Sequence, residues 1–67
     1  MGIIIIREMV GTSPRSWSDA ARQAVATASK TVRNIQTVDV VKSSAVVENG
    51  EIVEYRVDVK IGFEYEG

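Results

Sequence analysis

The chain has 67 residues, enough for one domain spanning residues 1–67 and too few for two. It contains no cysteine and no histidine, which excludes disulfides, thiolate metal sites and a histidine general base. Eight Lys and Arg residues nearly balance nine Asp and Glu residues and are scattered singly, unlike the basic stripe of a nucleic-acid-binding protein. Because so small a domain buries only about 60% of its unfolded surface, we expect partner subunits, or as a lesser alternative a carboxylate-bound cation, to stabilise it.

The apolar run Ile3–Ile6 near the N-terminus is much shorter than the about 20 residues that cross a bilayer. It also lacks the basic segment and the cleavage site of a signal peptide. We therefore expect a cytoplasmic protein with no membrane partner.

Two elements are predicted in the first half of the chain. A strand rich in β-branched residues runs from about Ile3 to Val10 and is expected to stop at the sequence Gly-Thr-Ser-Pro of residues 11–14. A helix follows, with Ser16 as N-cap and Asp19 at the capping-box spacing, or with a start one turn earlier at Ser13. Asn34 is the expected stop. Apolar residues recur at helical spacing at Trp17, Ala20, Ala21, Ala24, Val25, Ala28, Val32 and Ile35.

Two strands are predicted in the second half, from about Ile35 to Glu48 and from about Glu51 to Tyr65. The dipeptide Asn49-Gly50 between them is a strong hairpin signal because both residues tolerate positive φ. From Val53 to Tyr65 the last strand alternates, with apolar residues at odd positions and polar residues or glycine at even ones. Its regular alternation predicts that it is the central strand and pairs antiparallel with the first.

The expected lengths of the elements do not match. A strand of about 13 residues extends about 43 Å, whereas a helix of about 17 residues spans about 26 Å. One helix cannot cover the apolar face of the hairpin, so an end carrying Phe63 and Tyr65 is expected to remain exposed. Exposed apolar patches mark interfaces, and the geometry therefore predicts an oligomer.

Three segments make the chain similar to the dodecin family: Gly-Thr-Ser-Pro at residues 11–14, Thr-Val-Arg-Asn-Ile at residues 31–35, and Val-Lys-Ile-Gly-Phe-Glu at residues 59–64. The resemblance implies an α+β fold, a βαββ protomer whose three-stranded antiparallel sheet partly wraps around one helix. It also implies a hollow homododecamer, about 88 kDa for twelve chains of 7.3 kDa. Most dodecins bind flavins in pairs at two-fold axes, where a tryptophan stacks on the ring and a glutamine hydrogen-bonds its edge.

The chain departs from this pattern at both positions. Thr37 aligns with the tryptophan and Arg56 with the glutamine, so these two residues are the candidate ligand-binding residues. Threonine offers no ring for stacking, and we expect riboflavin or FMN to bind weakly or not at all. The alternative is that Thr37 and Arg56 are ordinary strand residues, with Arg56 paired across strands to a carboxylate such as Asp39.

The stretch Ser-Pro-Arg-Ser-Trp at residues 13–17 is similar to that of the calcium-dodecin subgroup, which suggests calcium as another ligand. No metal-binding residues can be assigned: Glu48, Glu51 and Glu54 near the hairpin turn lack the spacing of a calcium loop. Trp17 is expected to pack in the core or in an interface rather than to bind a ligand.

Two function classes follow. The first is a non-enzymatic shell that stores or buffers a small ligand, and the second is a ligand-free structural or interaction module. No nucleophile or base can be named for an enzyme.

Overall fold

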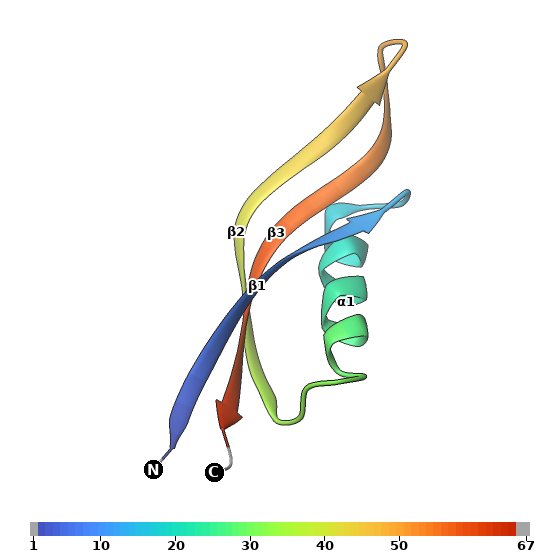
Figure 1. The fold of residues 1–67 in the computed structure, drawn as a ribbon. Coiled ribbons are helices and arrows are strands. Elements are labelled where there is room, and N and C mark those ends of the chain that lie inside the picture. The colour runs from blue at the N-terminus through green and yellow to red at the C-terminus, as the bar shows by residue number, and fades with distance from the viewer. Residues whose placement is uncertain (1, 66–67) are drawn as a thin grey trace.

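A computed structural model describes residues 2–65. They form β1 (Ile3–Ser13), α1 (Trp17–Ala28), β2 (Ile35–Glu48) and β3 (Glu51–Tyr65). The strand order is β1-β3-β2, and both outer strands pair antiparallel with β3. α1 lies across one face of the sheet (Figure 1). The predicted βαββ fold, with the third strand in the centre, is confirmed.

β1 continues three residues beyond the predicted end at Val10. Gly11 stays in the strand, opposite Val57 of β3, because it lies directly under α1. A Cβ built at Gly11 would collide with the backbone carbonyl oxygen of Ala20 and would lie 3.0 Å from the Cβ of Ala24. This glycine permits a close approach between strand and helix and does not mark a turn.

The start of α1 was predicted correctly and its end was not. Ser16 is the N-cap, and its hydroxyl accepts a hydrogen bond from the Asp19 backbone N–H at 3.0 Å. The capping box is incomplete, because the Asp19 carboxylate accepts from the Ser13 hydroxyl at 2.6 Å instead of returning to the cap. α1 has 12 residues and ends at Ala28, not near Asn34. Among the described residues, no helix is long and apolar enough to cross a membrane.

The early end of α1 has a local cause. The N–H groups of Lys30 and Thr31 bond three residues back, to the carbonyls of Thr27 and Ala28, which tightens the last turn. Asn34 then adopts a φ of 61° and turns the chain into β2. Ile35 therefore packs on the core from β2 and not from the helix.

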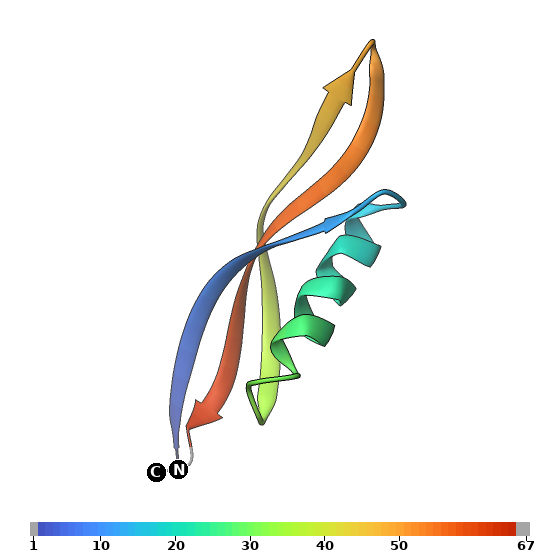
Figure 2. The same ribbon diagram turned by 45° about the vertical axis from the view of Figure 1, so that its right-hand side comes forward.

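The β2–β3 hairpin turns at the predicted residues. Asn49 and Gly50 have φ values of 53° and 78°, as the prediction required. The register shifts three times along β2, between Ile35 and Thr37, between Val40 and Lys42, and between Val46 and Val47. Such irregularities increase the local twist of a strand, and the hairpin twists along its length in Figure 2.

The core is small and lies only under α1. It contains Ala20, Ala24 and Ala28 of the helix together with Val57, Val59 and Ile61 of β3. Because the alanines are short, α1 approaches the sheet closely and buries little area of its own.

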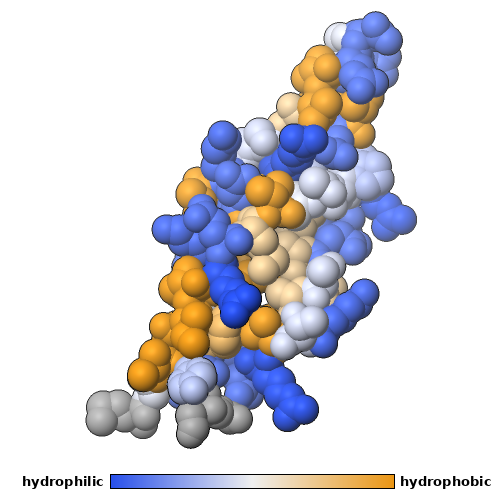
Figure 3. Space-filling model, in the orientation of Figure 1, coloured by the Kyte–Doolittle hydropathy of each residue, from blue (hydrophilic) through white to orange (hydrophobic). Residues whose placement is uncertain are grey.

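The hairpin extends well beyond this core. The last pair between β1 and β3 is Ser13–Tyr55, so residues 46–54, which we call the hairpin arm, have neither β1 nor α1 beside them. The radius of gyration is 13.6 Å, compared with about 11 Å for a compact domain of this length. Hydrophobic residues are exposed near the free end of the arm and along the N-terminal half of β1 (Figure 3). The predicted mismatch between hairpin and helix is present, and the arm is the larger uncovered part.

Candidate functional site

The candidate residues Thr37 and Arg56 both lie on the face of the sheet opposite α1, which we call the open face. Val57, Val59 and Ile61 point toward the helix and are buried, so the even-numbered residues of β3 point the other way. Thr37 lies opposite Gly62 in the register and therefore shares this face.

Thr37 forms one side of a notch whose floor is Gly62. A Cβ added at Gly62 would lie 2.6 Å from Thr37 Oγ1 and 3.2 Å from Ile6 Cδ1, with Ile4 Cγ2 at 3.4 Å. Ile4 and Ile6 are both about half exposed. The notch therefore combines one hydroxyl with two aliphatic side chains. The sequence prediction assigned Gly62 to the polar face and missed this notch. The signal that could have revealed the notch is that Gly62, which has no side chain, lies between the charged residues Lys60 and Glu64 on that face.

Arg56 lies in a different environment. Its neighbours in the register are Thr12 of β1 and Ser44 of β2. Its Nε donates to Glu54 Oε2 at 2.7 Å, and the Arg56 and Glu54 side chains are 50% and 36% exposed. The alternative, in which Arg56 pairs across strands with a carboxylate such as Asp39, is wrong in its partner: Asp39 lies opposite Lys60, and Arg56 pairs with Glu54 of its own strand. An ion pair this exposed contributes little, at most about 1 kcal/mol.

One subunit does not bring the two candidate residues together. Thr37 lies at the level of Gly62, six residues along β3 from Arg56. That separation is about 20 Å at 3.3 Å per residue. A small ligand cannot touch both residues of the same subunit, so a site that uses both must contain residues from two copies.

Charged side chains of alternating sign occupy the open face between these residues. Lys60 lies between Glu8 of β1 and Asp39 of β2, and Asp58 lies opposite Lys42 in the next row. Each acid has a lysine as neighbour, so the subunit itself gathers no acidic cluster on this face. Among residues 2–65, no group of three or more His, Cys, Asp or Glu side chains is placed to hold a metal ion.

No aromatic side chain of residues 2–65 lies on the open face. Tyr55, Phe63 and Tyr65 occupy odd positions of β3 and share the face of the buried core residues, and Trp17 is on the helix. These four are all the aromatic residues of the chain. The face that carries Thr37 and Arg56 therefore has no ring for stacking on a flavin.

Trp17 joins the start of α1 to the base of the hairpin arm. Its Nε1 donates to the Ser44 carbonyl at 2.8 Å, and its ring meets Tyr55 edge-on at 4.8 Å between centroids. The side chain remains 41% exposed. Trp17 thus belongs to a partly open packing contact, and in one subunit it is not part of the core.

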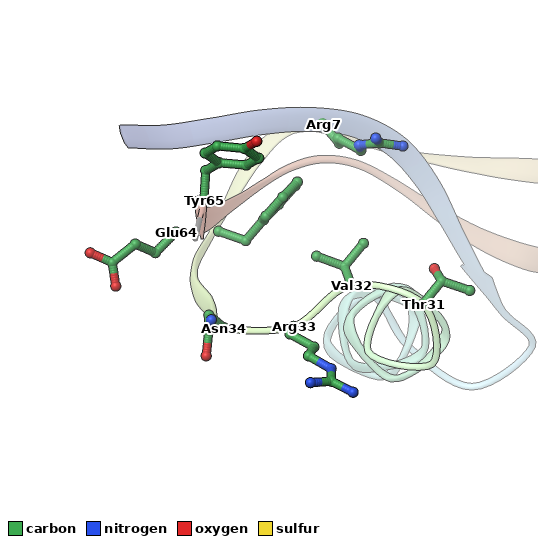
Figure 4. Close-up of a pocket in the computed structure, with 8 residues that line it drawn as sticks. Arg7, Thr31, Val32, Arg33, Asn34, Glu64 and Tyr65 are labelled. Atoms are coloured by element: carbon green, nitrogen blue, oxygen red, sulfur yellow. The ribbon is translucent and has the colours of Figure 1, made fainter. Parts of the chain in front are cut away.

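A shallow hollow of about 280 Å³ lies near the other end of the sheet (Figure 4). Arg7 contributes a guanidinium 5.9 Å from the centre of the Phe63 ring. The side chains of Arg33 and Glu64 point away from the hollow on different sides. Its charged groups do not converge on one point, so the hollow defines no specific ligand chemistry. Its lining residues are Arg7, Thr31, Val32, Arg33, Asn34, Phe63, Glu64 and Tyr65.

Comparison with known proteins gives a consistent result. The family model for dodecin matches residues 3–66. The chain belongs to the dodecin family. It is 30% identical over 63 residues to calcium dodecin of Mycobacterium tuberculosis, covering 94% of this chain and 89% of that protein.

Solved dodecin structures share the fold. Dodecin from Streptomyces coelicolor superposes with a TM-score of 0.96 at 33% identity, covering 98% of this chain and 94% of that one. The crystal structure of the M. tuberculosis calcium dodecin, a calcium-chelating antigen with a calcium-binding site, gives a TM-score of 0.83 at 31% identity. It covers 96% of this chain and 91% of that one. The predicted family and the similarity to a calcium dodecin are confirmed, whereas Thr37 and Arg56 as ligand residues stay predictions.

Proposed function

We propose that the chain is the subunit of a hollow, cytoplasmic homododecamer that binds and buffers a small ligand other than flavin, without catalysis. The observation that carries this proposal is the absence of any aromatic side chain on the open face among residues 2–65. A planar aromatic ligand would find only a hydroxyl, aliphatic groups and alternating charges there.

The energetics disfavour a flavin at this face. An aromatic stack contributes about 0.5–1.5 kcal/mol beyond the area that it buries, and a two-fold site would lose two such stacks. Arg56 offers hydrogen-bond donors only, whereas a glutamine amide both donates and accepts. Part of the polar edge of a flavin ring would therefore be desolvated without a partner, at a cost of about 1–3 kcal/mol for each such group.

A divalent cation is the second candidate ligand. It is favoured by the 30% identity to a protein named calcium dodecin and by the acids Glu8, Asp39 and Asp58 on the open face. Because lysines separate these acids within a subunit, a calcium site requires carboxylates from several copies meeting at a symmetry axis. The remaining alternatives are a flavin site of altered composition and a shell with no ligand.

Titration of riboflavin and FMN into the purified protein tests the proposal. We expect no fluorescence quenching at submicromolar concentrations. The double variant Thr37→Trp with Arg56→Gln is the matched comparison and should gain quenching, because it restores both groups that contact the ring. Submicromolar flavin binding by the unaltered protein would contradict the proposal. Calorimetric titration with Ca²⁺ then separates a cation-binding shell from a ligand-free one.

A further inference from the structure

The side of α1 that faces β2 is left open by the subunit itself. α1 packs mainly on β1 and β3 and makes little contact with β2. Between α1 and β2 lies a groove of about 310 Å³, which we call the α1–β2 groove. Its lining is apolar except for one arginine: Ala21, Arg22, Val25, Ala26 and Val38. Val38 is 41% exposed although it lies opposite the buried Ile61.

The hairpin arm is a second uncovered apolar element. Val47 and Ile52 lie directly opposite one another in the register and are 59% and 47% exposed. Val53 is 44% exposed as well. An isolated two-stranded hairpin is marginally stable in water, so an ordered arm of this composition needs cover from another surface.

The arm cannot fill the groove of its own subunit. The groove lies at the level of Ile61, which is opposite Val38. Ile52 is nine residues further along β3, about 30 Å away. The arm also extends away from α1, which forms one wall of the groove (Figure 1). The occupant that fits must come from a second copy.

The charges of the two surfaces are complementary. Residues 46–54 contain three glutamates and no basic residue, whereas residues 15–33 contain four Lys or Arg residues and one acid, Asp19. Glu48 and Glu51 lie directly opposite one another at the end of the arm. Like charges in that position are destabilising, and a basic partner relieves them. Arg22 is such a partner, because it lines the groove.

We propose that the hairpin arm of one copy docks in the α1–β2 groove of the next, with Val47 and Ile52 against the groove wall and the arm glutamates beside Arg22. Because arm and groove are different surfaces, each subunit gives one arm and receives another, and the contact repeats around a closed ring. This inference rests on the oligomeric shell of the proposed function and assigns one of its interfaces.

Cysteine cross-linking tests the proposal directly, because the chain has no cysteine of its own. A chain carrying Ile52→Cys with Ala26→Cys should form intermolecular disulfides on mild oxidation and give a ladder of multimers on a non-reducing gel. Ile52→Cys with Val38→Cys probes the other wall of the groove in the same way. A bridge within one chain is excluded, since a disulfide needs Cα atoms within about 7 Å.

The matched control is Ile52→Cys with Gln23→Cys. Gln23 is exposed on the same helix but lies on its other flank, beside Met9 and Val10 of β1. We expect no ladder from this pair. The inference is wrong if neither of the two cysteine pairs that include a groove residue forms a ladder, provided that light scattering shows these variants to be assembled. In that case the arm does not dock in the groove. If the unaltered protein is a monomer, the shell itself is wrong.

Charge reversal gives an independent measurement. Glu51→Arg and Arg22→Glu should each lower the urea concentration at which the oligomer dissociates, and the chain carrying both should recover most of the loss. Both side chains are exposed in the subunit, so neither change should reduce its helix content. Additive losses in the double variant would overturn the pairing of the arm with Arg22.

Discussion

The middle of β3 and its start have a similar share of apolar residues but opposite environments. Val57, Val59 and Ile61 are at most 1% exposed beneath α1, whereas Ile52 and Val53 in the arm are nearly half exposed. The difference arises because α1 begins at Trp17, whose ring contacts Tyr55, so the helix covers the middle of β3 and does not extend over the arm (Figure 1). An alternating strand thus shows which of its residues share a face, and the reach of the covering element decides which of those residues are buried.

The largest expected effect on stability comes from comparing a substitution in the core under α1 with one in the hairpin arm. Ile61→Ala should lower the free energy of unfolding by about 2–5 kcal/mol, because it leaves a cavity under α1. Ile52→Ala should change the unfolding of the subunit by less than about 0.5 kcal/mol, since its side chain is exposed there. Circular dichroism and light scattering followed in the same urea titration distinguish the cases: Ile61→Ala shifts the loss of helix, and Ile52→Ala shifts the loss of assembly. Equal shifts in the helix signal would show that the arm is as integral to the subunit as the core.

A glycine in each region provides the next comparison. Gly11→Ala places a methyl group against the Ala20 carbonyl and should cost about 1–3 kcal/mol, because both contacting groups are backbone or tightly packed. Gly50→Asn at the end of the arm should change stability by less than about 0.5 kcal/mol, because nothing lies within 4 Å and asparagine tolerates positive φ. Chemical unfolding of both variants measures the difference. A neutral Gly11→Ala would mean that α1 moves away from β1 without loss.

The smallest expected effect concerns Trp17, which connects the start of α1 to the base of the hairpin arm. Trp17→Phe keeps a ring beside Tyr55 and removes the N–H that donates to the Ser44 carbonyl. The loss should be about 0.5–1.5 kcal/mol, the net contribution of one hydrogen bond. Amide hydrogen exchange should become faster at the base of the arm while the amides of α1 keep their protection. Faster exchange throughout α1 would instead place Trp17 among the residues that hold the core together.

The sequence by itself determined the local features of this protein. Ser16 caps the helix, Asn49 and Gly50 form the hairpin turn, and the second and third strands have the predicted bounds. Each of these features depends on residues a few positions apart, and their conformational preferences are visible in the chain. The length mismatch between helix and hairpin was also predictable, because rise per residue differs between the two kinds of element.

Only the tertiary structure decided how distant segments meet. Gly11 was expected to end the first strand, but it remains in the strand because α1 packs closely against it. The pairing register places Gly62 beside Thr37, where it forms the floor of a notch. The register likewise separated Thr37 from Arg56 by six positions on one strand. Alignment of single positions could nominate both residues but could not give the distance between them. That distance depends on which residues of different strands face one another, and pairing between strands is a long-range property that no short stretch of sequence carries.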